Sequence, residues 1–284
     1  MSKTVALIGY PVGHSVSPAM QQAAFDHCGL DVRYERWETP LDRLAVAFAD
    51  LRRPEVLGAN VTIPLKEYAV PFLDRVDAAA KRIGAVNTIV NDYGSLTGYN
   101  TDASGFMRAL KEEGMFDTEG RCGVVLGAGG VARAVAFALA DSGIESLLIV
   151  NRSMDRAVEL ASALGQAVPK GPAVTAMPLE KARVENAFRA CHLIVNCTSL
   201  GMKGSPTEGR SPLSAEHIPR DALVFDLVYN PIETPLLVEA RKAGAGVVGG
   251  LAMLVYQGAE SFRLWVDRDP PVDVMLQHAR LALQ

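Results

Sequence analysis

The chain has 284 residues, of which 49% are hydrophobic and 21% charged, and its formal net charge at pH 7 is −4. This length is enough for two domains, and the composition is typical of a globular protein. The negative charge argues against nucleic acid as the main partner, and no apolar run is long enough to span a membrane or to act as a signal peptide. We therefore expect a cytoplasmic protein that binds neither nucleic acid nor membranes.

The cysteines and histidines predict no metal site. The four cysteines lack any CxxC pair, and the five histidines show no ligand spacing. We interpret the cysteines as reduced, small apolar side chains.

The first predicted strand, Val5 to Gly9, leads through a turn to two serines, Ser15 and Ser17. Pro18 suits the first turn of a helix that runs from Ala19 to about His27, with Ser17 as its N-cap. Taken alone, two serines before a helix are more simply a cap and its neighbour than a ligand site.

Polar residues follow the next strands in the same way. After a strand at Tyr34 to Trp37 and a helix at Leu41 to Leu51, Asn60 and Thr62 alternate with apolar residues, which places them on one face of a strand. Lys66 lies just beyond, where we expect a helix to start. An isolated lysine is usually solvated, so this residue gains interest only from its neighbours.

A further strand is expected from Ile83 to Val90, and Asn87 interrupts its apolar run. A buried polar group needs a partner, so either a local hydrogen bond or a ligand is expected there. Gly94 then makes a hairpin turn and the chain returns through Leu96 to Asn100. Asp102 follows, either as the N-cap of a helix up to Glu113 or as a functional carboxylate.

Residues 121–156 predict a βαβ unit with a glycine-rich first turn. Gly127 allows a sharp exit from the first strand, and Gly129 lacks a Cβ, so that a pyrophosphate can approach the backbone. The helix that follows offers free N–H groups and partial positive charge to phosphates. The candidate phosphate-binding residues are Gly127, Ala128, Gly129, Gly130 and Val131.

The end of the second strand of this unit favours NADP over NAD. NAD-binding units usually carry Asp or Glu there, whereas this chain has Asn151, Arg152 and Ser153, followed by Arg156. Guanidinium groups bind a 2′-phosphate as a bidentate fork. The simpler alternative is a solvated helix start capped by Asn151 or Ser153.

Strands continue to alternate with helices up to Gly249, which predicts a doubly wound parallel sheet. A ligand crevice lies at the carboxyl ends of such strands, and Thr198, Leu227 and Gly250 fall near those ends. Two helices complete the chain, at Leu251 to Trp265 and at Val272 to about Leu283. Gln257 interrupts the first of them, and it lies either on an exposed face or in a site.

Eight stretches together make the chain resemble the shikimate dehydrogenase family over nearly its whole length. They are GYPVGHSVSP (9–18), GANVTIPLKE (58–67), IGAVNTIV (83–90), GYNTDASGF (98–106), GAGGVARA (127–134), NRSMDR (151–156), NCTSLGM (196–202) and GLAMLVYQGAESFRLW (250–265).

The resemblance implies an enzyme that uses NADP(H) to interconvert 3-dehydroshikimate and shikimate, as a monomer or homodimer. It implies an α/β fold of two domains: an N-terminal substrate domain (1–102) completed by the C-terminal helices (251–284), and a Rossmann-type NADP-binding domain (103–250). Lys66 and Asp102 match the family's catalytic pair, and Arg152 and Arg156 match its arginines for the 2′-phosphate. The residues that match its substrate contacts are Ser15, Ser17, Asn60, Thr62, Asn87, Tyr229 and Gln257.

Two alternatives stay open at this stage. One is a quinate/shikimate or aminoshikimate dehydrogenase of the same family. The other belongs to a different class, a catalytically silent NADP-binding redox sensor. Reduction of a ketone needs a proton donor beside the developing alkoxide, which a lysine near an aspartate can supply. The presence of Lys66 and Asp102 argues against the sensor.

Overall fold

The computed structural model describes residues 2–284, apart from the side chain of Val184. The chain divides into two compact units, Met1–Gly105 with Leu254–Gln284, and Phe106–Met253. Each unit is built on its own six-stranded sheet with helices packed against it, so the α/β fold class is confirmed. The unit boundaries fall within two helices, α4 (Asp102–Glu112) and α9 (Gly250–Val266).

The sheet of the first unit is mixed. Its strand order is β2-β1-β3-β5-β6-β4, and β5 runs antiparallel to both of its neighbours. The reversal comes from a two-residue hairpin, in which Tyr93 (φ 48°) and Gly94 (φ 90°) both have the positive φ that a tight hairpin requires. The strands are β1 (Lys3–Gly9), β2 (Val32–Glu38), β3 (Val56–Val61), β4 (Arg75–Val76), β5 (Thr88–Asp92) and β6 (Ser95–Tyr99).

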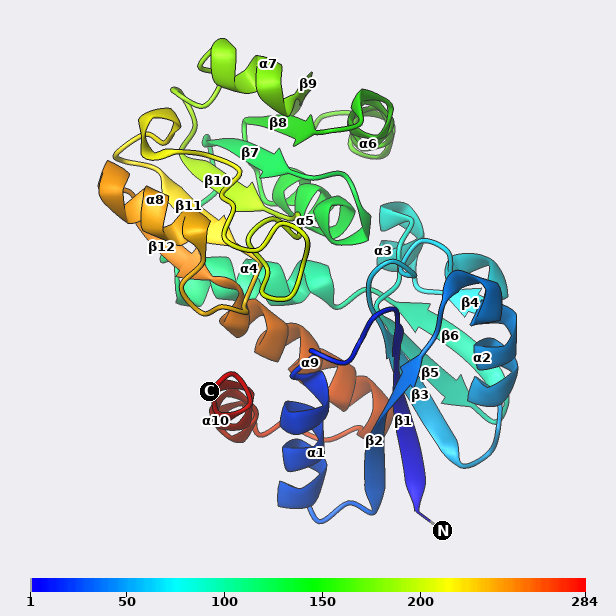
Figure 1. Ribbon diagram of the computed structural model, residues 1–284. Coiled ribbons are helices and arrows are strands. Elements are labelled where there is room, and N and C mark those ends of the chain that lie inside the picture. The colour runs from blue at the N-terminus through cyan, green and yellow to red at the C-terminus, as the bar shows by residue number, and fades with distance from the viewer. Residues whose placement is uncertain (1) are drawn as a thin grey trace. The chain divides into compact units, whose positions relative to one another are not determined.

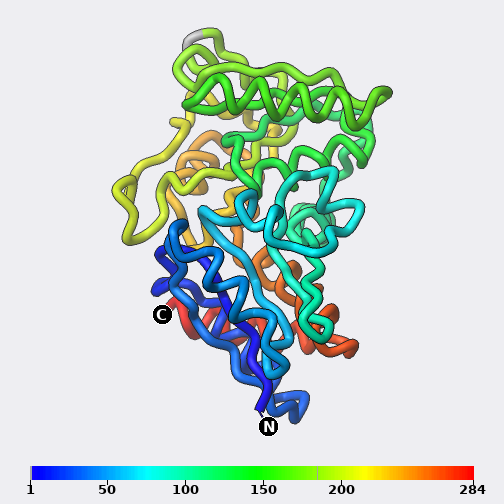
Figure 2. Tube along the Cα trace, turned by 90° about the vertical axis from the view of Figure 1, so that its right-hand side faces the viewer, coloured from blue at the N-terminus to red at the C-terminus, as the bar shows by residue number. Residues whose placement is uncertain are grey.

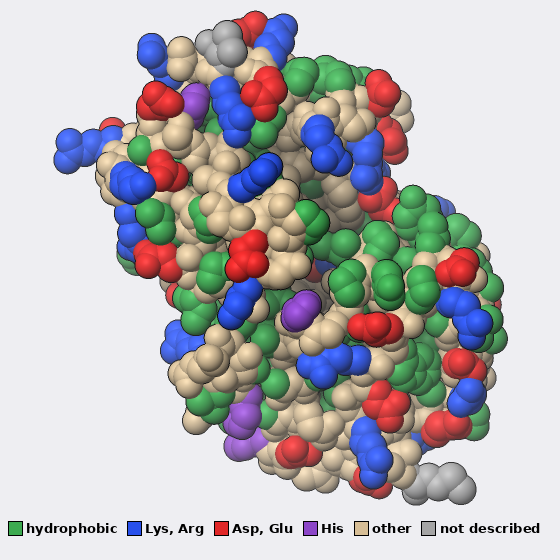
Figure 3. Space-filling model, in the orientation of Figure 1, with side chains coloured by type: hydrophobic (Ala, Val, Ile, Leu, Met, Phe, Trp, Pro, Cys, Tyr) green, Lys and Arg blue, Asp and Glu red, His purple; other side chains and the backbone are tan. Residues whose placement is uncertain are grey.

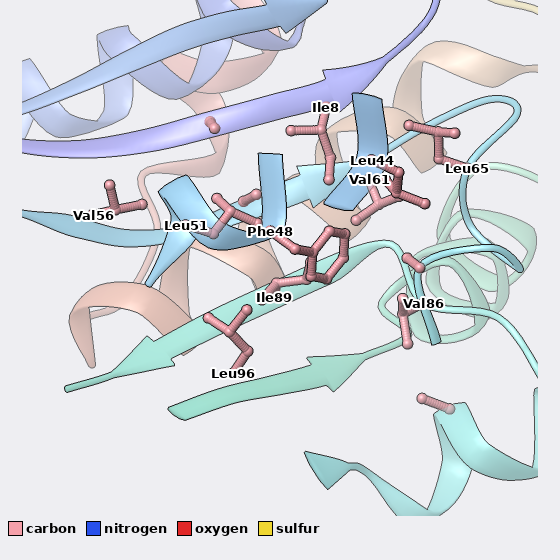
Figure 4. Packing of buried hydrophobic residues seen from close by; sticks show 14 residues of the cluster. Ile8, Leu44, Phe48, Leu51, Val56, Val61, Leu65, Val86, Ile89 and Leu96 are labelled. Carbon is pink, nitrogen blue, oxygen red and sulfur yellow. The ribbon is translucent and has the colours of Figure 1, made fainter. Parts of the chain in front are cut away.

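Helices cover both faces of this sheet. Helix α2 (Leu44–Leu51) places Leu44, Phe48 and Leu51 on one stripe, and Figure 4 shows these side chains packed over Ile8, Val61 and their neighbours on the strands. On the opposite face, α1 (Ser17–His27) and α10 (Val272–Leu281) lie side by side in both Figure 1 and Figure 2. The remaining elements are α3 (Ala78–Ile83), η1 (Leu41–Arg43) and η2 (Val70–Phe72).

Several local expectations in the first unit are wrong. The N-cap of α1 is Val16, and Ser17 is the first helical residue. No helix starts after Pro64, and Lys66 lies in a run of turns instead. The expected strand from Ile83 begins only at Thr88, since Ile83 ends α3 and Gly84 terminates that helix with a left-handed φ of 75°.

The sheet of the second unit is parallel throughout, as expected for a doubly wound fold. Its order is β12-β11-β10-β7-β8-β9, so the chain moves outward from β7 in one direction and then returns to the other side at β10. The strands are β7 (Cys122–Leu126), β8 (Ser146–Asn151), β9 (Ala173–Pro178), β10 (Leu193–Asn196), β11 (Leu223–Asp226) and β12 (Gly246–Gly249).

Alternate residues of these strands pack against helices on opposite faces. Val124, Ile194 and Val224 pack in the cluster that includes residues of α7 (Leu179–Val184) and α8 (Pro235–Ala243). On the other face, Phe225 stacks on Phe106 of α4, with ring centroids 5.3 Å apart. The other helical elements are α5 (Gly130–Asp141), α6 (Met154–Ala167) and η3 (Ala215–His217). Sequence reasoning missed α8, which starts at Pro235 after the N-cap Thr234.

Charged side chains of both signs are interspersed on the face shown in Figure 3. Within residues 2–284, no helix is both long and apolar enough to cross a membrane. All four cysteines are free, and in the same described part of the chain no three His, Cys, Asp or Glu side chains lie together so that they could hold a metal ion.

Candidate active site

The topology of the first sheet brings distant polar residues to one edge. Strands β1 and β3 are parallel, so the segments that follow them leave the sheet at the same edge. Because β5 is reversed, its first residue Thr88 lies opposite both Asn60 near the end of β3 and Tyr99 at the end of β6. Asn87, which precedes β5, and Asp102, which follows β6, therefore lie at this edge.

Lys66 and Asp102 form an ion pair at this edge. The Lys66 Nζ atom donates to Asp102 Oδ2 at 2.5 Å, and only 14% and 4% of the two side chains are exposed. The Asp102 carboxylate is not a helix cap, since the backbone N–H groups of Asp102 and Ala103 donate to Asn100 Oδ1 instead. The carboxylate is thus available to hold the ammonium group.

The amide of Asn87 orients Asp102 from the other side. Its Nδ2 atom donates to Asp102 Oδ1 at 2.9 Å and lies 2.9 Å from Thr101 Oγ1 and 3.1 Å from Gln257 Oε1. The Asn87 Oδ1 atom accepts from the backbone N–H of Thr101 at 2.8 Å. The two oxygens of Asp102 are therefore fixed by separate donors, and Gln257 of α9 joins the same group rather than an exposed face.

Asn60 belongs to a second, buried part of the same network. Its Oδ1 atom accepts from Tyr34 Oη at 2.7 Å, and its Nδ2 atom donates to Ser261 Oγ at 3.0 Å. Ser261 lies 2.7 Å from Thr88 Oγ1 and donates to the backbone oxygen of Gln257 at 3.0 Å. Strands β3 and β5 and helix α9 are thereby joined beneath the ion pair.

Ser15, Ser17 and Thr62 follow the neighbouring strand ends. Ser15 Oγ accepts from the backbone N–H of Ser17 at 3.2 Å, so the first serine shapes the entry to α1. The Thr62 backbone N–H donates to Ile8 at 2.9 Å, and its side chain lies over Gly9, where a Cβ would come within 2.4 Å of it. All three residues therefore lie at the polar edge of the first sheet.

The carboxyl edge of the second sheet carries the glycine turn after β7. Gly127 has a φ of +116°, which favours glycine. Gly129 is the N-cap of α5, and a Cβ placed there meets no protein atom within 4 Å. An open space beside free helix N–H groups fits a pyrophosphate, and Ala128, Gly130 and Val131 complete the turn.

The residues after β8 also fit the expected cofactor. Arg152, Ser153 and Arg156 are exposed, and the side chain of Asn151 donates to the backbone oxygen of Ser153 at 2.9 Å. Ser153 is the N-cap residue of α6 without a side-chain capping bond. An exposed guanidinium group next to a helix start suits a phosphate.

Three other candidates lie at the ends of β10, β11 and β12. Thr198 lies next to Gly127, where a Cβ would be 3.4 Å from its methyl group. Leu227 and Gly250 touch, because a Cβ on Gly250 would lie 2.3 Å from the Leu227 oxygen, so only glycine fits there. Tyr229 is half-buried and follows β11 in this second unit, not in the unit that holds the other expected substrate contacts.

Comparison with known proteins decides the family. Residues 7–89 match the shikimate dehydrogenase substrate binding domain, residues 110–202 match shikimate/quinate 5-dehydrogenase, and residues 250–280 match the shikimate 5′-dehydrogenase C-terminal domain. The chain is 49% identical to a shikimate dehydrogenase (NADP(+)) of Moorella thermoacetica, over 98% of this chain and 93% of that protein. The chain belongs to the shikimate dehydrogenase family.

Solved structures of this family have the same fold. Shikimate 5-dehydrogenase from Thermus thermophilus, in complex with NADP(H) and shikimate, superposes with a TM-score of 0.86 at 44% identity, covering 99% of this chain and 100% of that chain. Quinate dehydrogenase from Corynebacterium glutamicum, in complex with NAD, gives a TM-score of 0.87 at 33% identity, covering 98% of each chain.

Within this family fold, sequence reasoning missed the residues that support the site from below. Tyr34 and Ser261 in the first unit, and Asp226 and Thr234 in the second, carry buried hydrogen bonds to strand-end residues. The available signal was a single polar residue in an otherwise apolar segment, as with Asp226 at the end of β11.

Proposed function

We propose that the chain catalyses the NADP(H)-dependent interconversion of 3-dehydroshikimate and shikimate in the shikimate pathway, the reaction that gives its family its name. The observation that carries this proposal is the enclosed Lys66–Asp102 ion pair, held by Asn87 at the polar edge of the first sheet. A proton donor fixed in this way is what reduction of a ring ketone requires.

In the reducing direction, Lys66 donates a proton to the oxygen at C3 of the ring as that oxygen becomes an alkoxide. Bound NADPH supplies the hydride for the carbon atom. Asp102 holds the Lys66 ammonium in place and accepts a hydrogen bond from a ring hydroxyl. In the oxidising direction, the same proton returns from the hydroxyl group to Lys66.

The other polar residues of the first unit orient the substrate. Ser15 and Ser17 donate hydrogen bonds to its carboxylate, and Thr62 and Gln257 contact the ring hydroxyls. Asn60 and Asn87 contribute mainly through their bonds within the buried network, since the amide oxygen and nitrogen of each already have partners there. Tyr229 is the expected substrate contact from the second unit.

We assign the cofactor to the second unit. The glycine turn Gly127–Val131 holds the pyrophosphate, Arg152 and Arg156 hold the 2′-phosphate with Asn151 and Ser153, and Thr198, Leu227 and Gly250 contact the nicotinamide half. The proposed domains are accordingly 1–102 with 251–284 for substrate and 103–250 for NADP. We expect the protein to work in the cytoplasm as a monomer or homodimer.

A quinate-type activity is the second candidate, supported by the similarity to a quinate dehydrogenase at 33% identity. The two activities are distinguished by initial rates with shikimate and quinate, each with NADP and NAD. We expect kcat/KM to be highest for shikimate with NADP. A higher value for quinate or for NAD would transfer the assignment to the quinate branch, and no turnover with bound NADP would favour the redox sensor.

A further inference from the structure

A buried carboxylate lies behind the carboxyl edge of the second sheet, and the proposed chemistry does not use it. Asp226 ends β11 and is fully enclosed, as are its partners Asn196 and Thr234. Asn196 Nδ2 donates to Asp226 Oδ1 at 2.8 Å, and Thr234 Oγ1 donates to Asp226 Oδ2 at 2.6 Å. Because its oxygens are enclosed and already accept these bonds, Asp226 cannot itself contact a substrate.

The bonds continue from this carboxylate to the loops at the strand ends. Asn196 Oδ1 accepts from Thr198 Oγ1 at 2.7 Å and from the Thr198 backbone N–H at 3.1 Å. Asp226 Oδ1 also accepts from the backbone N–H of Val228 at 3.0 Å. One charged group therefore fixes the turn after β10 and the turn after β11 together. We call Asn196, Thr198, Asp226 and Thr234 the Asp226 network.

Both turns touch other candidate cofactor residues. The turn after β10 lies against Gly127 of the glycine turn, where a Cβ would be 3.2 Å from the Cys197 oxygen. The turn after β11 lies against Gly250 through the Leu227 oxygen. A shift of either turn would therefore move residues at the ends of four adjacent strands, β7, β10, β11 and β12.

The sheet itself does not need this carboxylate. Asn196 and Asp226 are already register partners in the parallel ladder of β10 and β11. Burial raises the pKa of Asp226 to about 6, against the effect of its three hydrogen bonds. A buried carboxylate is a costly way to join two strands that are already paired, and groups of this kind are best attested where they fix one arrangement among several.

We propose that Asp226 is a positioning residue for the cofactor: acting through Asn196 and the Val228 backbone, its carboxylate holds Thr198 and Leu227 where they meet the nicotinamide half of NADP(H). This inference rests on the proposed assignment of NADP to the second unit. It adds three residues, Asn196, Asp226 and Thr234, that act through others and do not touch the cofactor themselves.

The test compares variants of the Asp226 network with a matched control in the same unit. Asn196→Ala cuts the link to Thr198, and Thr234→Val removes one hydroxyl at almost constant shape. Thr118→Val is the control, because Thr118 is also buried and its hydroxyl donates to the Ser142 oxygen at 2.8 Å, in the loop before β7. NADPH affinity is measured by fluorescence titration, together with KM for shikimate and the melting temperature.

We expect Asn196→Ala to raise the NADPH dissociation constant by about tenfold and by no more than about a hundredfold, the upper end for a hydrogen bond to a charged group. Thr234→Val, which loses one hydrogen bond to the carboxylate, should weaken NADPH binding by about threefold or more. Thr118→Val should lower only the melting temperature. KM for shikimate should change by less than about threefold in all three. Asp226→Asn, which keeps an acceptor for Asn196, should bind NADPH better than Asp226→Ala.

Equal NADPH affinity in the network variants and the Thr118 control, at temperatures where each is folded, would overturn the positioning role. If Asn196→Ala or Asp226→Ala does not fold, the near-isosteric Thr234→Val and Asp226→Asn variants decide the question. Wild-type protein that binds no NADPH would contradict the proposed function instead, so the two failures are distinguishable.

Discussion

Asn87 links the Lys66–Asp102 ion pair to Asn60: the Asn87 Nδ2 atom donates to Asp102, which holds Lys66, and the Asn60 Nδ2 atom lies 3.1 Å from the backbone oxygen of Asn87. The Lys66–Asp102 ion pair and the buried Asn60 group are therefore one connected structure. Substitutions in the ion pair and in the buried group should therefore be distinguishable by their effects on catalysis, ligand binding and stability.

Replacing Lys66 with alanine should remove the proton donor. We expect kcat to fall by about 10²–10⁴ and KM for shikimate to stay within a few-fold, the pattern for an interaction made in the transition state. Single-turnover hydride transfer is the measurement, and Lys81→Ala, an exposed lysine on α3, is the control. A wild-type chemical step in Lys66→Ala would leave Asp102 or a water molecule as the acid.

Replacing Arg152 with alanine should weaken the binding of NADP much more than that of NAD, because only NADP carries the 2′-phosphate. The expected loss is about 1.5–3 kcal/mol, or about ten- to a hundredfold in affinity. Arg121→Ala, an exposed arginine before β7 at the other edge of the sheet, should affect neither cofactor. Equal weakening of both cofactors by Arg152→Ala would show that the guanidinium does not read the 2′-phosphate.

Replacing Ser17 with alanine should raise KM for shikimate by about tenfold, the value of one hydrogen bond to a carboxylate. The melting temperature should hardly change, because α1 starts at Ser17 and is not capped by its hydroxyl. Shikimate that lacks its carboxylate provides the control, since its KM should be the same for both proteins. A variant that only melts earlier would return this serine to a structural role.

Replacing Ser261 with alanine should destabilise the first unit by about 1–3 kcal/mol, because Asn60 and Thr88 lose a buried partner. Urea unfolding followed by tryptophan fluorescence reports on this unit, because both tryptophans of the chain, Trp37 and Trp265, lie in it. The control is Ser104→Ala on α4, an exposed serine that should change stability by about 0.5 kcal/mol or less. Equal midpoints for both variants would contradict a supporting role for Ser261.

The raised pKa of Asp226 predicts how the stability of the protein depends on pH. Its pKa rises on folding from 3.8 to about 6. The folded chain therefore binds more protons than the unfolded chain between these values, and stability falls as the pH rises through this range. Two pKa units correspond to about 3 kcal/mol. Asp226→Asn should lack this slope, so that its stability relative to wild type rises by that amount between about pH 4 and pH 7. Parallel stability profiles would argue against a raised pKa.

The sequence predicts which polar residues and glycines follow the strand ends, because strands and their ends can be recognised from hydrophobic patterns. Lys66, Asp102 and Gly127 lie at such ends. The support beneath them could not be predicted, since the bonds of Ser261 and Asp226 join elements that are far apart in the chain. Local patterns also mislead where two structures share one pattern. The apolar run at Ile83–Val86 suits a strand, but Gly84 ends a helix there.

Because β5 is reversed, the length of the β5–β6 hairpin can change without moving Asn87 and Asp102 apart. Asn87 and Asp102 lie at one end of the β5–β6 hairpin, and its turn at Tyr93 and Gly94 lies at the other end, with Tyr93 fully exposed. Extra residues at that tip would lengthen the chain between two groups that stay 2.9 Å apart. The tip is therefore a suitable place in this unit for an inserted tag or fluorescent label.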